Sequence, residues 1–328
     1  MKKIKILNPA KGRNEPTFRP LMVIRQRLLD FGIQIVTEGD NFDILFVGMD
    51  SFINKKVPLS ESIETGLQFL STLDCDYYLF DGSDSTSLMG AYEVLVGSNA
   101  KGLFKNQLLK NREDYKTSTA HGKWWFGTDS DLLLGYDIPE DVWGKIHLTG
   151  YNLGWLNPSY RQHVNITGKE NSVCAIFQAD HDYNEDHKSR NDHFYSIHRN
   201  TCWGRLKNSS HNVHMDRLSY QEYMRLLINS FASISPFGMG EVCFRDFEAI
   251  QCYSALIKPT MEKIQTMPNI YIANETYVPV SVDWIDLEEK LDYTIENYAD
   301  IVTNARETFY KEYTVDKLCD VWYNILNR

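Results

Sequence analysis

The chain has 328 residues, 43% of them hydrophobic and 24% charged, so it is long enough for two globular domains and too apolar to be disordered throughout. Its 34 basic and 44 acidic residues give a formal net charge of -10, which argues against a protein that coats a polyanion. The apolar runs are far shorter than the roughly 20 residues of a membrane span, and the N-terminal one is too short for a secretory signal. The six cysteines are scattered without a CxxC pair, so we expect free thiols and a cytoplasmic location.

The first half of the sequence alternates strand and helix patterns. Leu21, Ile24, Leu28 and Phe31 recur at helical spacing, and Gly32 follows where a helix would stop. A second helix is expected after the loop that begins at Asp81. Short apolar runs predict strands at residues 4–8, 33–37, 44–47 and 76–80, and the second helix is placed at residues 85–94. This alternation predicts an open α/β sheet that binds ligands beyond the carboxyl ends of its strands.

The second half repeats the pattern. Strands are expected at residues 173–177, 232–235, 255–257 and 270–272, and helices at residues 218–231, from about residue 241, around Leu287, and at 315–326. The intervening residues 125–170 are rich in Trp, Gly and Pro and show no clear period. We therefore predict an N-terminal domain over residues 1–160, a C-terminal domain over 161–305, and a terminal segment, 306–328, that ends in an amphipathic helix.

The most informative segment is residues 233–250, which we predict to form the end of a strand, then a glycine turn, then the start of a helix. Gly238 and Gly240 allow a ligand to approach the backbone closely, and the N–H groups that open the next helix favour phosphate. Arg245 lies one turn into that helix, where it can contact a diphosphate. Glu241 and Glu248 are seven residues apart, on nearly the same helical face, and suit sugar or ribose hydroxyls. The alternative is a structural glycine turn with Arg245 in an ion pair.

A longer string surrounds this segment. It comprises SPFGxGExxxRDFEA at residues 235–249, KPxM at 258–261, PNIY at 268–271, ETYVP at 275–279 and DLEEK at 286–290. Over residues 233–290 the chain resembles the donor-binding half of GT-B glycosyltransferases. The N-terminal half resembles them only in its strand order and in the polar sequence that begins at Asp81.

The resemblance implies two Rossmann-like domains facing across a cleft. The C-terminal domain would hold a nucleotide-sugar, the N-terminal domain a glycan or other hydroxyl acceptor, and the final helix would cross back to the N-terminal domain. The implied activity is hexosyl or pentosyl transfer without a metal or other cofactor. The residues implied in donor binding are Gly238 and Gly240 beside the diphosphate, Arg199 and Arg245 as its basic partners, Glu241 or Glu248 on the donor hydroxyls, and Lys258 facing the cleft.

An inverting transfer also needs a base near the acceptor hydroxyl, and we expect it in an N-terminal loop. Asp81 and Asp84 rank first because they follow a convincing strand, and Asp50 follows another. Glu15 and His121 rank lower. The structural alternative for Asp81 and Asp84 is an Asx turn that caps the next helix.

Four other functions stay open. A modified DNA base is a possible acceptor, although the negative charge makes nucleic acid an unexpected partner. Asp180-His181-Asp182 follows a predicted strand and resembles the DxD motif with which metal-dependent transferases hold a divalent ion. A dinucleotide-dependent oxidoreductase needs a third glycine where Cys243 stands and an acidic residue where Lys258 stands. The last is a non-catalytic binding protein.

Overall fold

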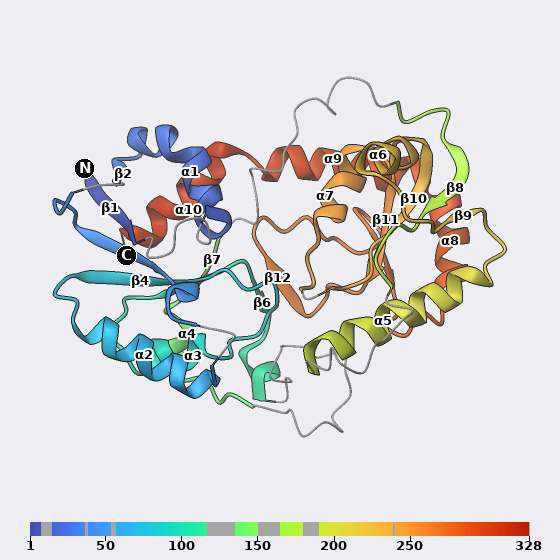
Figure 1. The fold of residues 1–328 in the computed structure, drawn as a ribbon. Coiled ribbons are helices and arrows are strands. Elements are labelled where there is room, and N and C mark those ends of the chain that lie inside the picture. Colours follow the sequence, from blue (N-terminus) through green and yellow to red (C-terminus); the bar gives the residue numbers. More distant parts are fainter. Residues whose placement is uncertain are drawn as a thin grey trace. The chain divides into compact units, whose positions relative to one another are not determined.

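The computed structural model describes residues 1–7, 15–36, 39–53, 57–116, 135–149, 165–179, 190–238 and 240–327. It divides into two compact units, which we treat separately (Figure 1). The N-terminal unit comprises Met1–Leu156, Thr266–Pro268 and Tyr313–Arg328, and the C-terminal unit comprises Asn157–Gln265 and Asn269–Glu312. Two of the predicted catalytic or metal-binding stretches, around His121 and at residues 180–182, lie outside the described residues.

The N-terminal unit contains a six-stranded sheet in the order β2-β1-β3-β4-β5-β7, and every pairing in it is parallel. The strands are β1 (Lys2–Leu7), β2 (Ile33–Val36), β3 (Ile44–Gly48), β4 (Asp76–Asp81), β5 (Leu103–Lys105) and β7 (Ile146–Leu148). The other elements are α1 (Glu15–Asp30), η1 (Met49–Ser51), α2 (Leu59–Ser71), α3 (Ala91–Val96), β6 (Gln107–Leu109), η2 (Arg112–Lys116) and α4 (Glu140–Trp143). The four strands predicted in this half are confirmed to within two residues at each end.

Alternate residues of these strands face opposite layers, as the period of a strand requires. Leu45 and Val47 of β3 lie in the core that α2 and α3 cover. Phe46 of the same strand points to the other face, where its ring centroid is 5.8 Å from that of Trp322. Trp322 belongs to the terminal helix α10 (Val315–Leu326), which lies beside α1 in this unit (Figure 1).

The helix predicted at residues 85–94 is wrong in its start, because α3 begins only at Ala91. The hydroxyls of Ser85 and Ser87 accept the backbone N–H groups of Ser87 and Met89, at 3.3 and 3.1 Å. These local bonds compete with helix formation. Gly90, at φ 80°, then precedes the first helical residue.

The C-terminal unit contains a five-stranded parallel sheet in the order β13-β11-β10-β8-β9. Its strands are β8 (Glu170–Cys174), β9 (Val213–His214), β10 (Ser230–Ile234), β11 (Ala255–Pro259) and β13 (Val278–Val280), and the short β12 (Ile264–Thr266) lies between the last two in sequence. Its helices are α5 (Arg190–Lys207), α6 (Tyr220–Asn229), α7 (Phe244–Gln251), α8 (Leu287–Glu296) and α9 (Tyr298–Glu312). None of the helices that the structure describes is long and apolar enough to cross a bilayer.

Three predictions for this half need correction. The strand expected at residues 173–177 lies three residues earlier, because β8 ends at Cys174. Residues 270–272 form no strand, because the Ile272 N–H donates to the Thr276 hydroxyl at 2.8 Å and the chain turns there. The helix expected from about residue 241 begins at Phe244. Its start is set by Asp246, whose carboxylate accepts the N–H of Cys243 at 3.1 Å and so caps the helix.

Both sheets have the same strand order when their strands are renumbered along the chain, namely 2-1-3-4-5, with one further strand in the N-terminal unit. This is the order of a doubly wound Rossmann-like fold, in which the order of the strands across the sheet reverses between the first and third strands. The reversal lies between β1 and β3 in one unit and between β8 and β10 in the other. Ligands bind such sheets at the carboxyl ends of these strands, which directs attention to the loops that follow them.

Candidate functional site

The segment after β10, residues 235–243, lies at the reversal point of the C-terminal sheet, and we call it the glycine loop. Helix α5 holds both backbone groups of Phe237 within it. The Phe237 N–H donates to His198 Nε2 at 3.2 Å, and Arg199 Nε donates to the Phe237 carbonyl at 3.0 Å. The Gly238 N–H donates to the Gly240 carbonyl at 3.0 Å. These three hydrogen bonds hold the backbone of the loop at Phe237, Gly238 and Gly240.

A side chain at position 238 would have to displace the guanidinium of Arg199. A Cβ atom at this position would lie 2.6 Å from Arg199 Nη2, closer than such contacts occur. Arg199 Nη1 also donates to the carbonyl of Gln178, in the segment that follows β8, at 3.2 Å. Arg199 thus joins the two segments at the reversal point and lies against the glycine loop.

The two ends of the glycine loop converge on the buried carboxylate of Asp246. Besides the N–H of Cys243, this carboxylate accepts the hydroxyl of Ser235 at 2.5 Å and that of Tyr271 at 2.7 Å. Lys258 Nζ lies 3.2 Å from it, and both side chains of this ion pair are fully buried. A buried lysine needs such a partner. The structure therefore places Lys258 inside the support of the loop, where its ammonium also lies 5.0 Å from the centre of the Phe237 ring.

Arg245 stands at the start of α7 and is partly exposed. Its Nε donates to the Ile176 carbonyl at 3.1 Å, and its Nη1 lies 3.5 Å from the Ser235 hydroxyl. Within the part of the chain that the structure describes, its Nη2 makes no hydrogen bond. One edge of the guanidinium is thus fixed by the protein, and the other can receive an anion.

Glu248 lies one turn further along α7 and faces α6. Its carboxylate accepts hydrogen bonds from the hydroxyls of Tyr223 at 2.8 Å and Tyr220 at 3.4 Å. Burial raises the pKa of Glu248, while the bond from Tyr223 and the charge of Arg245 oppose that rise. Glu241 and Gly240, in the loop itself, are buried. The predicted donor-site residues thus gather around one loop, with Glu248 on the flank that faces α6.

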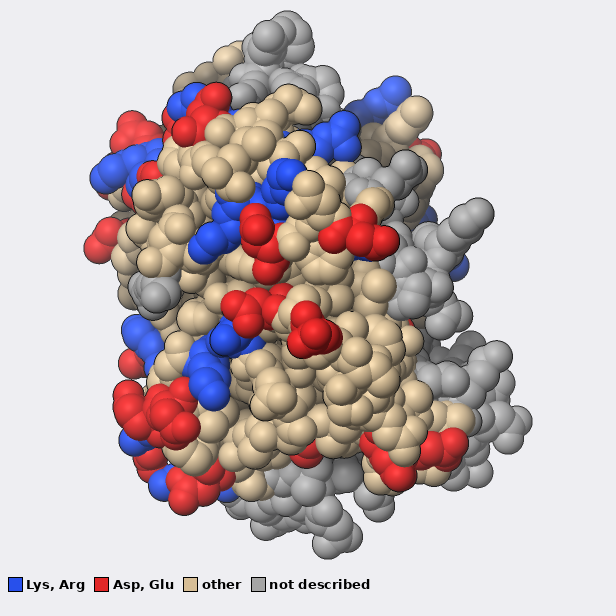
Figure 2. All heavy atoms as spheres, turned by 90° about the vertical axis from the view of Figure 1, so that its left-hand side faces the viewer, with Lys and Arg blue, Asp and Glu red and all other residues tan. Residues whose placement is uncertain are grey.

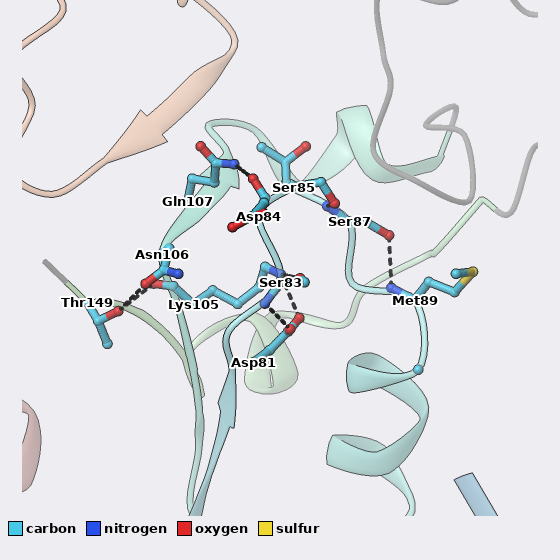
Figure 3. Close-up of polar contacts among 12 residues, drawn as sticks. Asp81, Ser83, Asp84, Ser85, Ser87, Met89, Lys105, Asn106, Gln107 and Thr149 are labelled. Carbon is cyan, nitrogen blue, oxygen red and sulfur yellow. Dashed lines mark hydrogen bonds and ion pairs between the residues drawn. The ribbon is translucent and has the colours of Figure 1, made fainter. Parts of the chain in front are cut away.

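In the N-terminal unit, Asp81 forms a buried polar cluster at the carboxyl ends of β4 and β5 (Figure 3). Its carboxylate is 2.6 Å from Lys105 Nζ and accepts the Ser83 N–H at 2.9 Å. Lys105 is fully buried and also donates to the Ser83 hydroxyl at 3.0 Å. The carbonyl of Lys105 accepts the Thr149 hydroxyl at 3.1 Å, which ties β5 to the residue after β7.

Asp84 and Asp50 have exposed side chains. The backbone carbonyl of Asp84 accepts the amide of Gln107 (Figure 3). Asp50 lies in η1, directly after β3 and so at the reversal point of this sheet. The Asx turn considered for this loop is formed by Asp81, and it caps no helix because α3 starts ten residues later.

Several further candidates cannot be placed. Asp180, His181, Asp182 and His121 lie outside the described residues, and the side chain of Glu15 is not described. Among the residues that are described, no group of three or more His, Cys, Asp or Glu side chains is arranged to hold a metal ion.

Sequence reasoning missed His198, Asp246, Tyr271 and Lys105. Asp246 and Tyr271 stand inside the quoted motifs, RDFEA and PNIY, so their positions were visible and only their roles were not. Lys105 ends a short apolar run, Leu103-Phe104-Lys105, which is a signal for a strand that ends in a polar group. His198 gives no sequence signal, since its partners lie 39 and 84 residues away.

No protein-family model matches the sequence, and a search of curated proteins finds no match. Among solved structures, the chain is similar to an α-glucosyltransferase in complex with UDP and a 13-mer DNA containing an HMU base, with a TM-score of 0.51 and 8% identity over 99% of both chains. It is also similar to a glycosyltransferase from Rickettsia africae ESF-5, at a TM-score of 0.49 and 14% identity over 99% of this chain and 98% of that one. A third similar structure is Anabaena Alr3699/HepE in complex with UDP-glucose, with a TM-score of 0.46 and 10% identity over 100% of both chains.

At sequence identities this low, structural similarity shows a shared fold and nothing about activity. The α/β architecture of two Rossmann-like domains, that of GT-B glycosyltransferases, is confirmed. The resemblance of residues 233–290 to the donor-binding half of these enzymes stays a prediction.

Proposed function

We propose that the protein is a metal-independent glycosyltransferase that moves a sugar from a nucleotide-sugar to a hydroxyl acceptor. One observation carries the proposal: the glycine loop, held by hydrogen bonds at Phe237 and Gly238, lies at the reversal point of the C-terminal sheet beside Arg245, whose Nε is fixed on the Ile176 carbonyl. A leaving diphosphate needs fixed positive charge, and Arg245 and Arg199 supply it beside the loop without a metal.

The residues in and around the glycine loop have two roles: some contact the donor, and others hold the loop in place. Arg245, Gly238 and Gly240 bind the diphosphate, and Arg199 adds charge beside them. Glu248 receives the hydroxyls of the donor. Lys258 acts through Asp246, because its ammonium is buried against that carboxylate. The transferred sugar is a hexose or a pentose.

In the N-terminal unit, we assign the catalytic base to Asp84 or Asp50. Both are exposed, as a group that takes a proton from a bound acceptor must be. Asp81 has both carboxylate oxygens engaged, by Lys105 and by the Ser83 N–H, so we propose that it orders the loop that carries Asp84.

The acceptor class we favour is a glycan or another hydroxyl compound, in the cytoplasm. A modified DNA base is the second candidate, favoured by the DNA-bound α-glucosyltransferase of similar fold. Against it, the net charge is -10, and acidic and basic side chains lie next to one another on the face shown in Figure 2. Ion pairs of this kind in the N-terminal unit include Lys5 with Asp40 and Lys101 with Asp76. A duplex needs a more uniformly basic surface.

The test is nucleotide binding by calorimetry, using UDP, GDP and ADP as probes on the wild type and on Arg245→Ala. We expect one diphosphate to bind the wild type and the variant to bind it about 10- to 100-fold more weakly, the value of a charge-assisted hydrogen bond or two. Arg205→Ala is the matched control, since Arg205 is exposed in the last turn of α5. Equal affinities of the two variants would remove Arg245 from the site.

A further inference from the structure

His198 is a buried histidine for which the reaction has no direct use. Its side chain comes from α5, and only 4% of the residue is exposed. Its ring stacks on that of Phe237, with centroids 5.6 Å apart and an angle of 22° between the planes. The ring of Trp284 lies 5.3 Å away. Two aromatic neighbours therefore fix the orientation of the imidazole plane.

Both ring nitrogens have a backbone partner, and the two bonds assign their roles. Nε2 accepts the Phe237 N–H at 3.2 Å, so it carries no proton. Nδ1 lies 3.1 Å from the Val282 carbonyl and donates to it. Only the neutral ring with its proton on Nδ1 makes both bonds. The imidazole thus connects the segment after β13, which holds Val282, to the glycine loop.

Phe237 is the residue immediately before Gly238, so its peptide group sets the direction in which the following N–H groups point. His198 holds its N–H and Arg199 holds its carbonyl. We propose that His198 is a positioning residue for the donor diphosphate: it orients the glycine loop without touching the ligand. This inference rests on the proposed function, because it assumes that the loop binds a diphosphate.

Two conservative variants separate the two hydrogen bonds. In His198→Gln the side-chain oxygen reaches the position of Nε2 and can accept the Phe237 N–H. In His198→Asn the shorter side chain keeps a donor near the position of Nδ1 for Val282 and loses the acceptor. Both variants lose the ring and its packing, so a purely structural role predicts equal effects.

The affinity for the diphosphate that binds the wild type best of UDP, GDP and ADP is measured by calorimetry, and thermal stability by circular dichroism. We expect His198→Gln to bind within about threefold of the wild type and His198→Asn to bind about tenfold more weakly, while the two variants melt at similar temperatures. Affinities that fall equally, or that follow the melting temperatures, would overturn the proposal.

A measurement without ligand keeps this test independent of the proposed function. Hydrogen–deuterium exchange is followed by mass spectrometry in the peptide that spans residues 235–243. We expect faster exchange in His198→Asn than in His198→Gln, and equal exchange would overturn the positioning role. If the wild type binds none of the nucleotides but the exchange differs as expected, the proposed function fails while His198 still orders the loop.

Discussion

A methyl group at position 238 would collide with Arg199 Nη2, which lies 2.6 Å from the place of the added Cβ. We expect Gly238→Ala to displace either the guanidinium or the loop and to weaken diphosphate binding at least tenfold. Calorimetry with the best-binding nucleotide measures this. Gly204→Ala is the control, because its added Cβ meets nothing within 4 Å and an alanine inside α5 stabilises the helix. Unchanged affinity in Gly238→Ala would show that the loop tolerates the shift.

The raised pKa of Glu248 predicts that this residue lowers the stability of the protein at neutral pH. Below the ordinary pKa of a glutamate, near 4.3, the side chain is neutral in both the folded and the unfolded chain. As the pH rises, the unfolded chain loses the proton more readily than the fold, where burial disfavours the charge. Glu248→Gln should therefore melt at nearly the wild-type temperature at pH 4 and a few degrees higher at pH 7.

Thermal unfolding of Glu248→Gln at a series of pH values checks this sign. Glu222→Gln is the comparison, because hydrogen bonds from Ser219 lower the pKa of Glu222 and the same change there should destabilise the protein at pH 7. A Glu248→Gln variant that melts lower than the wild type at pH 7 would contradict the prediction. A simultaneous loss of donor affinity would indicate that the carboxylate is kept for binding at a cost in stability.

At the residue scale, the sequence identified the loop but not the roles within it. Gly238, Gly240 and Arg245 stand in one contiguous string, and local geometry suffices to bring them together. Lys258 was predicted to face the ligand because it ends a strand. The structure pairs it with Asp246, twelve residues earlier. Such a partner depends on how strand and helix pack, which a single sequence does not specify.

Helix α10 illustrates the element scale, because its largest buried side chain packs on the aromatic rings of the N-terminal sheet. Trp322 is 1% exposed, and its ring lies within 6 Å of those of Phe46, Phe80 and Phe104. Trp322→Ala should lower the free energy of unfolding by about 3–5 kcal/mol, as a deleted buried tryptophan does. Urea unfolding followed by circular dichroism measures the change.

The next residue of the helix provides the control for that measurement. Tyr323 is 45% exposed, so Tyr323→Ala should cost less than about 1 kcal/mol. A loss below about 1 kcal/mol in both variants would mean that the packing of Trp322 contributes little to this unit. The contrast also explains why the helix was predictable: its apolar residues recur on one face, whereas the three-residue strands β5 and β7 are too short to show any period.

At the scale of the whole molecule, the repeated strand order gives the candidate site its location. In both sheets the strand order reverses between the first and third strands, and the glycine loop and Asp50 each follow the third strand of their unit. The alternation of strands and helices predicted this class of fold. It did not predict the register, nor that Lys105 would pair with Asp81, because those depend on strands that meet only in the folded chain.

The whole-molecule prediction concerns metal. Arg245 and Arg199, beside the glycine loop, offer positive charge to a diphosphate, and this contact needs no bridging cation. Nucleotide binding should therefore raise the melting temperature by the same amount in about 1 mM Mg²⁺ and in excess EDTA. By mass action, an unchanged Kd gives an unchanged stabilisation at the same nucleotide concentration. A DxD-type site would behave differently, since its ion carries most of the positive charge at the phosphates.

The variants that separate these two mechanisms act on different parts of the C-terminal unit. If EDTA abolishes the thermal shift and Asp180→Asn with Asp182→Asn does the same, the donor is held through a metal and our assignment to Arg245 is wrong. If the shift survives EDTA and the double variant but disappears in Arg245→Ala, the loop alone carries the diphosphate. Arg245 keeps its Nε on the Ile176 carbonyl and donates nothing to a carboxylate in the described chain, so its charge is available to that ligand.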